Sequence, residues 1–227
     1  PSEGETLYGA EETIQAQQGG LSGRDISFNS GWKFCLGNHS GASNPGFDDS
    51  GWENVTLPHD FSISQNFTTG GEAESGFLPG GTGWYRKSFT LPESESGKMV
   101  LLNFDGVYSD AYVYVNGSYV GEHHYGYSDF SFEISAYLKA DGVTENVIAV
   151  RAVNNVPSSR WYSGSGIYRD VTLDIVDPVH AAKNGIYVTT PDIASGRGTV
   201  SIESEIENQS GSSRTVTVSQ TVVDSAG

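Results

Sequence analysis

The sequence predicts an all-β protein: a β-sandwich of the jelly-roll type, followed by part of a second β-sandwich. Short runs of β-branched and aromatic residues recur from Arg24 onward, and Gly, Asn, Asp and Pro separate one run from the next. Few stretches have helical periodicity. About eight to ten such runs precede Asp177-Pro178, which is typical of a two-sheet sandwich.

The clearest local prediction is a β-hairpin around Asn116-Gly117. In Asp110–Val115 small and branched residues alternate with two tyrosines, so the two kinds face opposite sides of a strand. Ser118–Gly121 resumes the alternation. Asn-Gly between two such runs favours a type I′ turn, because both residues tolerate positive φ.

Further strands follow from the same kind of pattern, and large aromatic side chains between them predict a core. Trp32 and Trp52 are expected to fill it. The other strands expected in the first sandwich are Gly83–Leu91, Lys98–Phe104, Asp129–Ile134, Asn146–Val153 and Gly166–Val176.

The composition along the chain divides it into three parts. Residues 1–23 are polar and rich in Gly, which predicts a flexible leader with at most a short helix at Glu11–Gln17. Residues 24–177 form the first sandwich, and residues 178–227 begin the second. That last part contains three polar β runs, which make a poor core alone, so the rest of its sandwich is expected elsewhere. The three runs are Gly185–Thr190, Thr199–Glu207 and Ser213–Val223.

Charge and hydropathy exclude several classes of function. The 227 residues include 12 Lys and Arg against 28 Asp and Glu, a net charge of −16, which disfavours contact with nucleic acid. No apolar run approaches the ~20 residues of a membrane-spanning helix. One Cys, one Met and few Lys suit a secreted bacterial protein, located outside the cell or on its surface.

Candidate chemistry in the chain is sparse. Acidic residues sit in predicted turns without an evident catalytic pair, and no GxSxG, HExxH or GxxxxGK[ST] motif is present. The single Cys35 excludes an intramolecular disulfide and a thiolate zinc site. His59 and His123-His124 could ligate a metal or be satisfied by nearby polar groups, but adjacent strand residues cannot chelate one ion together. A structural calcium is chemically plausible without a supporting motif. We therefore expect no cofactor and no catalytic residue.

The stretch Asn154–Arg169 differs from the strands around it. It is a long connection that brings Arg, Trp and Tyr together among Ser, Gly and Asn. An indole can stack on the CH face of a sugar while Arg and Asn bond its hydroxyls. Alternatively, the aromatic residues simply cover one end of the sandwich. The candidate carbohydrate-binding residues are Asn155, Ser159, Arg160 and Trp161.

Five ordered segments together resemble the N-terminal sugar-binding domain of family 2 glycoside hydrolases, above all bacterial β-galactosidases. The similarity spans about 24–177, and 178–227 resembles the start of the immunoglobulin-like second domain of that family. The segments are Gly31-Trp32-Lys33-Phe34; Phe47–Trp52 with Leu57-Pro58-His59-Asp60; Gly80–Arg86; Phe104-Asp105-Gly106-Val107 through Asn116-Gly117; and Ser159–Arg169.

The resemblance implies a jelly roll beside a TIM barrel that carries two catalytic glutamates. This chain would then be the non-catalytic N-terminal part of a retaining exo-glycosidase that hydrolyses terminal β-galactosides. Its partners would be the carbohydrate and the barrel. β-Glucuronidase and β-mannosidase remain alternatives, as do a free-standing carbohydrate-binding module and a scaffold that mediates homodimer contacts.

The resemblance also implies which loops approach the sugar. Several members of the family place an Asp nine residues before the last Arg of Ser-Gly-Ile-Tyr-Arg, and Arg160 stands there in this chain. Another family contact, an Asn in the loop before Gly83–Leu91, has no clear counterpart. Glu72, Glu74 and Phe77 lie in that region, and the sequence does not choose among them.

Overall fold

A computed structural model describes residues 21–157 and 160–223 of the chain. The helix expected at Glu11–Gln17 and all but the end of the expected leader lie outside those residues. Two short 3-10 helices lie in connections between strands: η1 (Glu93–Glu95) and η2 (Ser135–Tyr137). The strands are β1 (Gly23–Ser27), β2 (Trp32–Leu36), β3 (Glu53–Val55), β4 (Gly81–Thr90), β5 (Met99–Phe104), β6 (Asp110–Val115), β7 (Ser118–His123), β8 (Phe130–Glu133), β9 (Glu145–Asn154), β10 (Val171–Val176), β11 (Val179–Ala194) and β12 (Arg197–Asn208).

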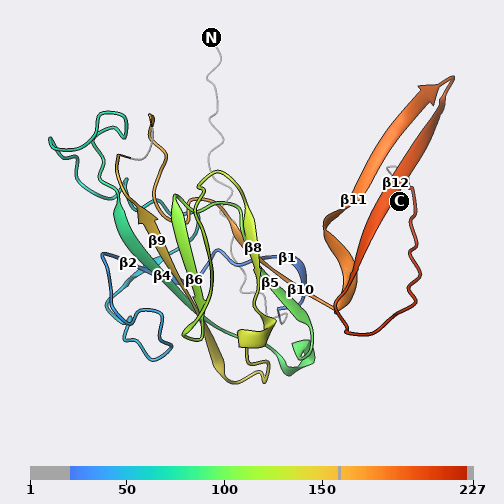
Figure 1. Cartoon of the computed structure of the whole chain (residues 1–227), viewed down its shortest axis with the longest axis horizontal. Coiled ribbons are helices and arrows are strands. Elements are labelled where there is room, and N and C mark those ends of the chain that lie inside the picture. The colour runs from blue at the N-terminus through green and yellow to red at the C-terminus, as the bar shows by residue number, and fades with distance from the viewer. Residues whose placement is uncertain (1–20, 158–159, 224–227) are drawn as a thin grey trace, which may run out of the picture.

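The first ten strands form two antiparallel sheets that face each other (Figure 1). One sheet has the order β3-β2-β4-β9-β6-β7, and the other has the order β1-β10-β5-β8. The all-β class and the β-sandwich predicted from the sequence are therefore confirmed. Strands far apart in the sequence pair at the centre of the larger sheet, where β4 pairs with β9 and β9 with β6.

The core lies between the two sheets, and its side chains are almost completely buried. Trp32 is fully buried there, whereas Trp52 is only half-buried and packs in a smaller cluster on the outer face of the larger sheet. The alternation predicted for β6 is confirmed: Ala111, Val113 and Val115 point into the core and the two tyrosines do not. Each aliphatic side chain removed from water contributes about 1.5–3 kcal/mol.

The predicted hairpin between β6 and β7 is also present. Asn116 has a φ of 49° and Gly117 a φ of 84°, the positive values that a type I′ turn needs. The expected strand Gly166–Val176 begins only at Val171. Residues 166–170 are held by other contacts, since Gly166 makes an isolated bridge to Tyr108 and the Ile167 carbonyl accepts from His59 N.

Beyond Asp177, β11 and β12 form a two-stranded sheet that projects from the sandwich (Figure 1). These strands contain the first two β runs predicted there. The third prediction is wrong, because Ser213–Val223 forms no strand. Its valines alternate with polar residues, but it pairs with no described strand, and a β-strand is stable only when its backbone groups find partners.

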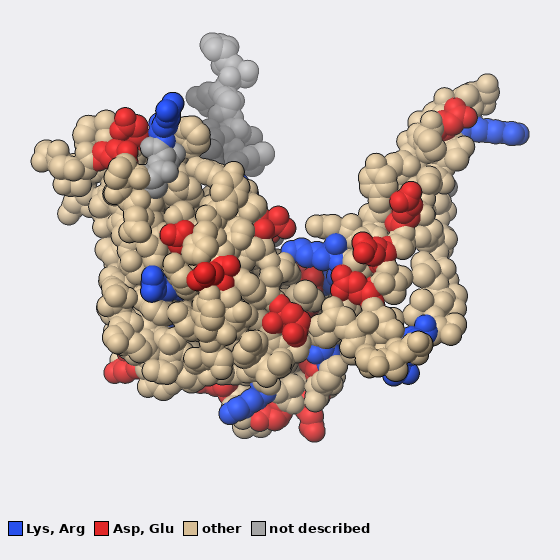
Figure 2. All heavy atoms as spheres, in the orientation of Figure 1, with Lys and Arg blue, Asp and Glu red and all other residues tan. Residues whose placement is uncertain are grey.

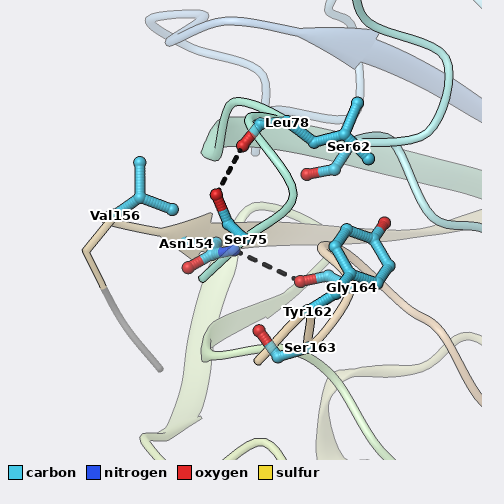
Figure 3. Close-up of a pocket in the computed structure, with 8 residues that line it drawn as sticks. All are labelled: Ser62, Ser75, Leu78, Asn154, Val156, Tyr162, Ser163 and Gly164. Carbon is cyan, nitrogen blue, oxygen red and sulfur yellow. Dashed lines mark hydrogen bonds between the residues drawn. The ribbon is translucent and has the colours of Figure 1, made fainter. Parts of the chain in front are cut away.

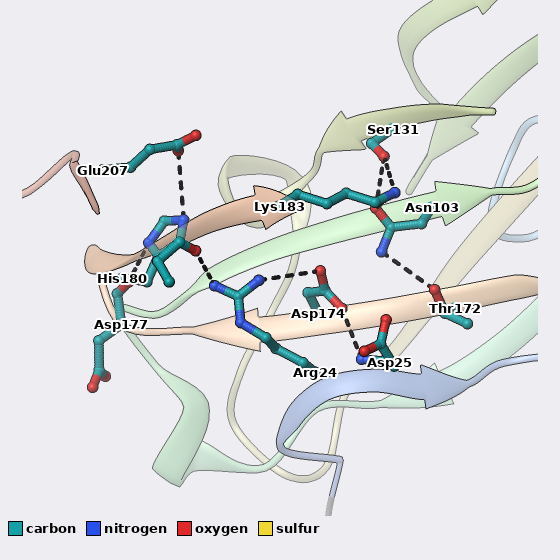
Figure 4. A network of polar contacts seen from close by, with 11 residues as sticks. Arg24, Asp25, Asn103, Ser131, Thr172, Asp174, Asp177, His180, Lys183 and Glu207 are labelled. Atoms are coloured by element: carbon teal, nitrogen blue, oxygen red, sulfur yellow. Dashed lines mark hydrogen bonds and ion pairs between the residues drawn. The ribbon is translucent and has the colours of Figure 1, made fainter. Parts of the chain in front are cut away.

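Polar contacts attach the base of β11 to the outer face of the smaller sheet (Figure 4). Arg24 donates to the Ala181 carbonyl and lies 3.7 Å from the buried carboxylate of Asp174. Lys183 Nζ donates to Asn103 Oδ1 and to Ser131 Oγ, each at 3.0 Å. Figure 2 shows basic and acidic side chains together in the hollow between sandwich and hairpin, as this network requires.

Two features of residues 21–157 and 160–223 bear on the function classes considered above. None of the helices there is long and apolar enough to cross a membrane. Within the same residues, no group of three or more His, Cys, Asp or Glu is arranged to hold a metal ion.

Candidate carbohydrate site

Four loops meet at one end of the sandwich, which we call the loop end: residues 56–80, 105–109, 124–129 and 155–170. The register brings them together, because Gly81 at the start of β4 is opposite Asn154 at the end of β9, and Asp110 at the start of β6 is opposite Val153. Loops 56–80 and 155–170 rise side by side from the larger sheet in Figure 1.

The predicted site residues lie on the outer part of loop 155–170. Asn155, Arg160 and Trp161 are all exposed, while Ser159 lies outside the described residues. Arg160 makes no ion pair with any residue that the structure describes. With no carboxylate partner among those residues, its guanidinium can donate to a ligand at the loop end.

Trp161 points away from the core. Its side chain is 60% exposed, and its Nε1 donates to the Tyr127 hydroxyl at 3.0 Å. Tyr127 is itself in edge contact with Tyr108 and Tyr125. The indole is thus held against a group of tyrosines with much of its surface in solvent, so it does not serve to fill the core.

Other exposed aromatic residues occur on the same loops. Phe67 and Phe77 of loop 56–80 and Tyr125 of loop 124–129 are each at least 45% exposed. Isolated exposed apolar residues are common, but several on converging loops are typical of a binding surface. Aromatic faces of this kind can stack on the CH groups of a sugar ring.

Beneath this surface a buried polar network holds the two long loops together. Asn154 Nδ2 donates to Ser165 Oγ at 2.7 Å and to the Gly164 carbonyl at 3.2 Å. Ser62 Oγ lies 2.6 Å from Ser165 Oγ and 2.7 Å from the Pro79 carbonyl. All three side chains are at least 95% buried, so the base of loop 155–170 is firmly anchored.

A small cavity lies above this network, with room for about one water molecule. Figure 3 shows its lining, which comes from both long loops and from the end of β9. The cavity is too small to hold a sugar ring.

Asp60 is a residue of this site that sequence reasoning missed. One carboxylate oxygen accepts from the backbone N of Ser62 at 2.9 Å and of Ser165 at 3.0 Å, and the other accepts from the Tyr162 hydroxyl. Burial and this carboxylate together raise the pKa of Tyr162, so the phenol stays protonated. The available signal was the segment Leu57-Pro58-His59-Asp60, where attention went to the histidine instead.

The histidines have structural partners. His59 Nδ1 lies 2.9 Å from the Tyr85 hydroxyl, and burial lowers the pKa of His59. His123 stacks on Phe130, whereas His124 lies on the other side, 3.0 Å from Asp110. The interpretation of satisfied histidines therefore fits this geometry better than a shared metal site.

The chain is similar to several known proteins. Residues 27–178 match the family described as "Glycosyl hydrolases family 2, sugar binding domain". The chain is 41% identical to beta-galactosidase BoGH2A of Bacteroides ovatus over 88% of this chain and 24% of that protein. It is 31% identical to a beta-glucuronidase of Formosa agariphila, over 88% of this chain and 23% of that one.

Solved structures give the same picture. A family 2 glycosyl hydrolase from Bacteroides cellulosilyticus superposes with a TM-score of 0.78 and 40% identity, covering 81% of this chain and 24% of that structure. A beta-glucuronidase from family 2 superposes with a TM-score of 0.72 and 31% identity, and the match covers 80% of this chain and 21% of that structure. The chain therefore spans about a quarter of the length of the relatives it matches.

Proposed function

Because this chain belongs to glycosyl hydrolase family 2, in its sugar binding domain, we propose that it forms the non-catalytic N-terminal part of a retaining exo-glycosidase that releases terminal β-galactosides. The observation that carries this proposal is the exposed Trp161, held outward by Tyr127 beside Arg160, which makes no ion pair with residues 21–157 or 160–223. This pair would form the rim of a sugar pocket shared with the catalytic part of the protein.

The chemistry of the rim suits a polyol. The exposed indole offers a flat apolar face for the CH groups of a sugar ring, and the guanidinium donates charge-assisted hydrogen bonds to hydroxyls. The bond cleavage itself would use two carboxylates in a double displacement. In this proposal those carboxylates lie in a barrel outside these 227 residues, and no cofactor takes part.

A β-glucuronide is the second candidate substrate. Arg160 carries a positive charge with no carboxylate partner among the described residues, and it would pair well with the carboxylate of a uronic acid. The relatives include both a beta-galactosidase and a beta-glucuronidase. Two relatives are 41% identical to this chain, a beta-galactosidase and a protein named "Putative beta-glucuronidase". We place galactosides first because the beta-galactosidase is matched over 88% of this chain and the other relative over 81%.

The proposal also covers the location of the protein and its partners. A location outside the cell or on the bacterial surface suits a hydrolase that acts on external glycans. Its partners would be the carbohydrate and the catalytic barrel, and homodimer contacts could involve this domain as well.

The test is a kinetic comparison in the full-length protein that carries this chain. Arg160→Ala should raise KM for p-nitrophenyl β-galactoside about ten- to a hundredfold, since a hydrogen bond to a charged group contributes about 1.5–3 kcal/mol. Trp161→Ala should also raise KM, because it removes the aromatic face on which the sugar would stack. Arg197→Ala, which removes an exposed arginine at the hairpin tip, is the matched control.

The same variants distinguish the two substrates. A larger loss on p-nitrophenyl β-glucuronide than on the galactoside upon Arg160→Ala would favour the glucuronidase alternative. Unchanged kinetics on both substrates, in variants that unfold at the wild-type temperature, would refute a role of this rim in sugar recognition.

A further inference from the structure

One carboxylate joins the two long loops of the loop end. Asp60 belongs to loop 56–80, but two of its three donors, Ser165 N and the Tyr162 hydroxyl, belong to loop 155–170. The third donor, Ser62 N, fixes the carboxylate in its own loop at 2.9 Å. Together with the backbone bond from Phe61 N to the Ser165 carbonyl, Asp60 helps to fix where one loop meets the other.

The chain of loop 155–170 turns back closely over this carboxylate. Gly164 has a φ of +79°, and a Cβ built there would lie 3.1 Å from Asp60 Oδ2. The tight turn brings Tyr162 onto the same oxygen. Tyr162 directly follows Arg160 and Trp161, so its phenol is the anchor nearest to the proposed sugar rim.

The buried network anchors only the base of the loop. Asn154, Ser165 and Ser62 hold the two ends together, whereas residues 155–157 and 160–162 are exposed and lack a core of their own. The side-chain bonds from Tyr162 to Asp60 and from Trp161 to Tyr127 help to orient the rim.

We propose that Asp60 is a positioning residue for substrate recognition, acting through its bond to the Tyr162 hydroxyl. This inference rests on the function proposed above. Asp60 does not touch the sugar. It holds the loop in the orientation in which Arg160 and Trp161 can bind. When that orientation is only partly populated, the apparent affinity falls by the populated fraction.

Two substitutions remove the same bond from opposite sides. Asp60→Asn keeps one oxygen for the backbone N–H groups of Ser62 and Ser165, but it replaces the acceptor of the phenol with an NH₂ donor. Tyr162→Phe removes the hydroxyl and leaves the exposed ring in place. Since both act on one bond, the double variant should behave like either single variant, with no further loss.

The experiment measures KM and kcat of the full-length protein with p-nitrophenyl β-galactoside and p-nitrophenyl β-glucuronide. Each single variant and the double variant should raise KM about tenfold, and saturating substrate should restore kcat to within about twofold, because uniform binding is lost. A variant that is merely partly unfolded would instead lower kcat and leave KM unchanged.

Asp49→Asn is the matched control. Asp49 also accepts two side-chain bonds, from Lys33 Nζ at 2.6 Å and Arg86 Nε at 2.7 Å, but it lies on loop 37–52, which packs on the outer face of the larger sheet. Its substitution should lower stability and leave KM unchanged. If Asp60→Asn fails to fold, Tyr162→Phe still tests the proposal.

The outcomes separate this inference from the proposed function. If Arg160→Ala raises KM while Asp60→Asn and Tyr162→Phe do not, the positioning role is wrong and the proposed rim stands. A double variant whose loss equals the product of the single losses would also overturn the shared-bond mechanism. If Arg160→Ala and Trp161→Ala also leave KM unchanged, the proposed rim itself is refuted.

Discussion

Side chains on the outer face of the larger sheet are held by charge as well as by packing. Arg86 is 2% exposed, and its guanidinium donates to Asp49 and to the carbonyls of Ala42, Asn44 and Pro45. These bonds tie loop 37–52 onto β4. A buried arginine is tolerable here because its N–H groups find acceptors.

The Asp49 interaction predicts a pH dependence of stability. Burial by itself would raise the pKa of Asp49, but hydrogen bonds from Lys33 and Arg86 outweigh it and hold the pKa below its ordinary value. A carboxyl with a lowered pKa stabilises the fold above its unfolded-state pKa, and this contribution disappears as the pH falls through the folded-state value.

We therefore expect Asp49→Asn to lower the free energy of unfolding at pH 7 by about 1.5–3 kcal/mol. The difference from wild type should shrink as the pH falls below about 4, the ordinary range for Asp. Urea unfolding of both proteins between pH 7 and pH 3 measures this. A difference that stays constant over that range would contradict the assignment.

Among the connecting elements, loop 155–170 depends most on its backbone geometry. Gly166 has a φ of +103°, and a Cβ built there would lie 2.1 Å from the Tyr85 hydroxyl and 3.0 Å from the Phe61 ring. Tyr85 and Phe61 are fully buried, so neither can move aside. Only glycine fits where this loop leaves the site and enters the core.

Gly166→Ala should lower the free energy of unfolding by about 3 kcal/mol or more, from backbone strain and overpacking together. Two controls separate these causes by thermal unfolding. Gly97→Ala has a positive φ in open space and should cost about 1 kcal/mol, while Gly51→Ala has open space and should be nearly neutral. Equal effects at Gly166 and Gly97 would rule out the steric clash.

At the scale of the whole molecule, we expect the 227-residue chain by itself to bind sugar weakly. The proposed rim is an exposed surface above a cavity too small for a sugar, and a ligand bound there would bury only part of its area. High affinity would require further pocket walls, which we expect from the proposed catalytic part of the protein.

Calorimetry of the 227-residue chain with galactose, lactose and glucuronic acid tests this expectation. Little or no heat of binding at millimolar sugar is the expected result. Binding in the micromolar range would instead favour a free-standing carbohydrate-binding module, whose aromatic loop binds a glycan without help from another domain.

Patterns within short segments of the sequence are sufficient to predict much of the fold. The period-two alternation of β6 and the Asn116-Gly117 turn are local properties, and both predictions are confirmed. Ser213–Val223 shows where such patterns fail. It alternates as well as β6 does, but no partner strand comes to it among the described residues, and pairing is not encoded in the run itself.

The candidate site, too, could be predicted only in part from the sequence. Composition, alternation and turn chemistry determine that the chain is all-β and that an Arg-Trp-Tyr loop leaves a strand near Val153. Only the folded molecule brings Asp60 to Ser165, 105 residues away, and sends the indole of Trp161 to Tyr127. The reason is that alternation and turns arise from neighbours along the chain, whereas these contacts exist only once two sheets have closed on each other and brought distant loops to one end.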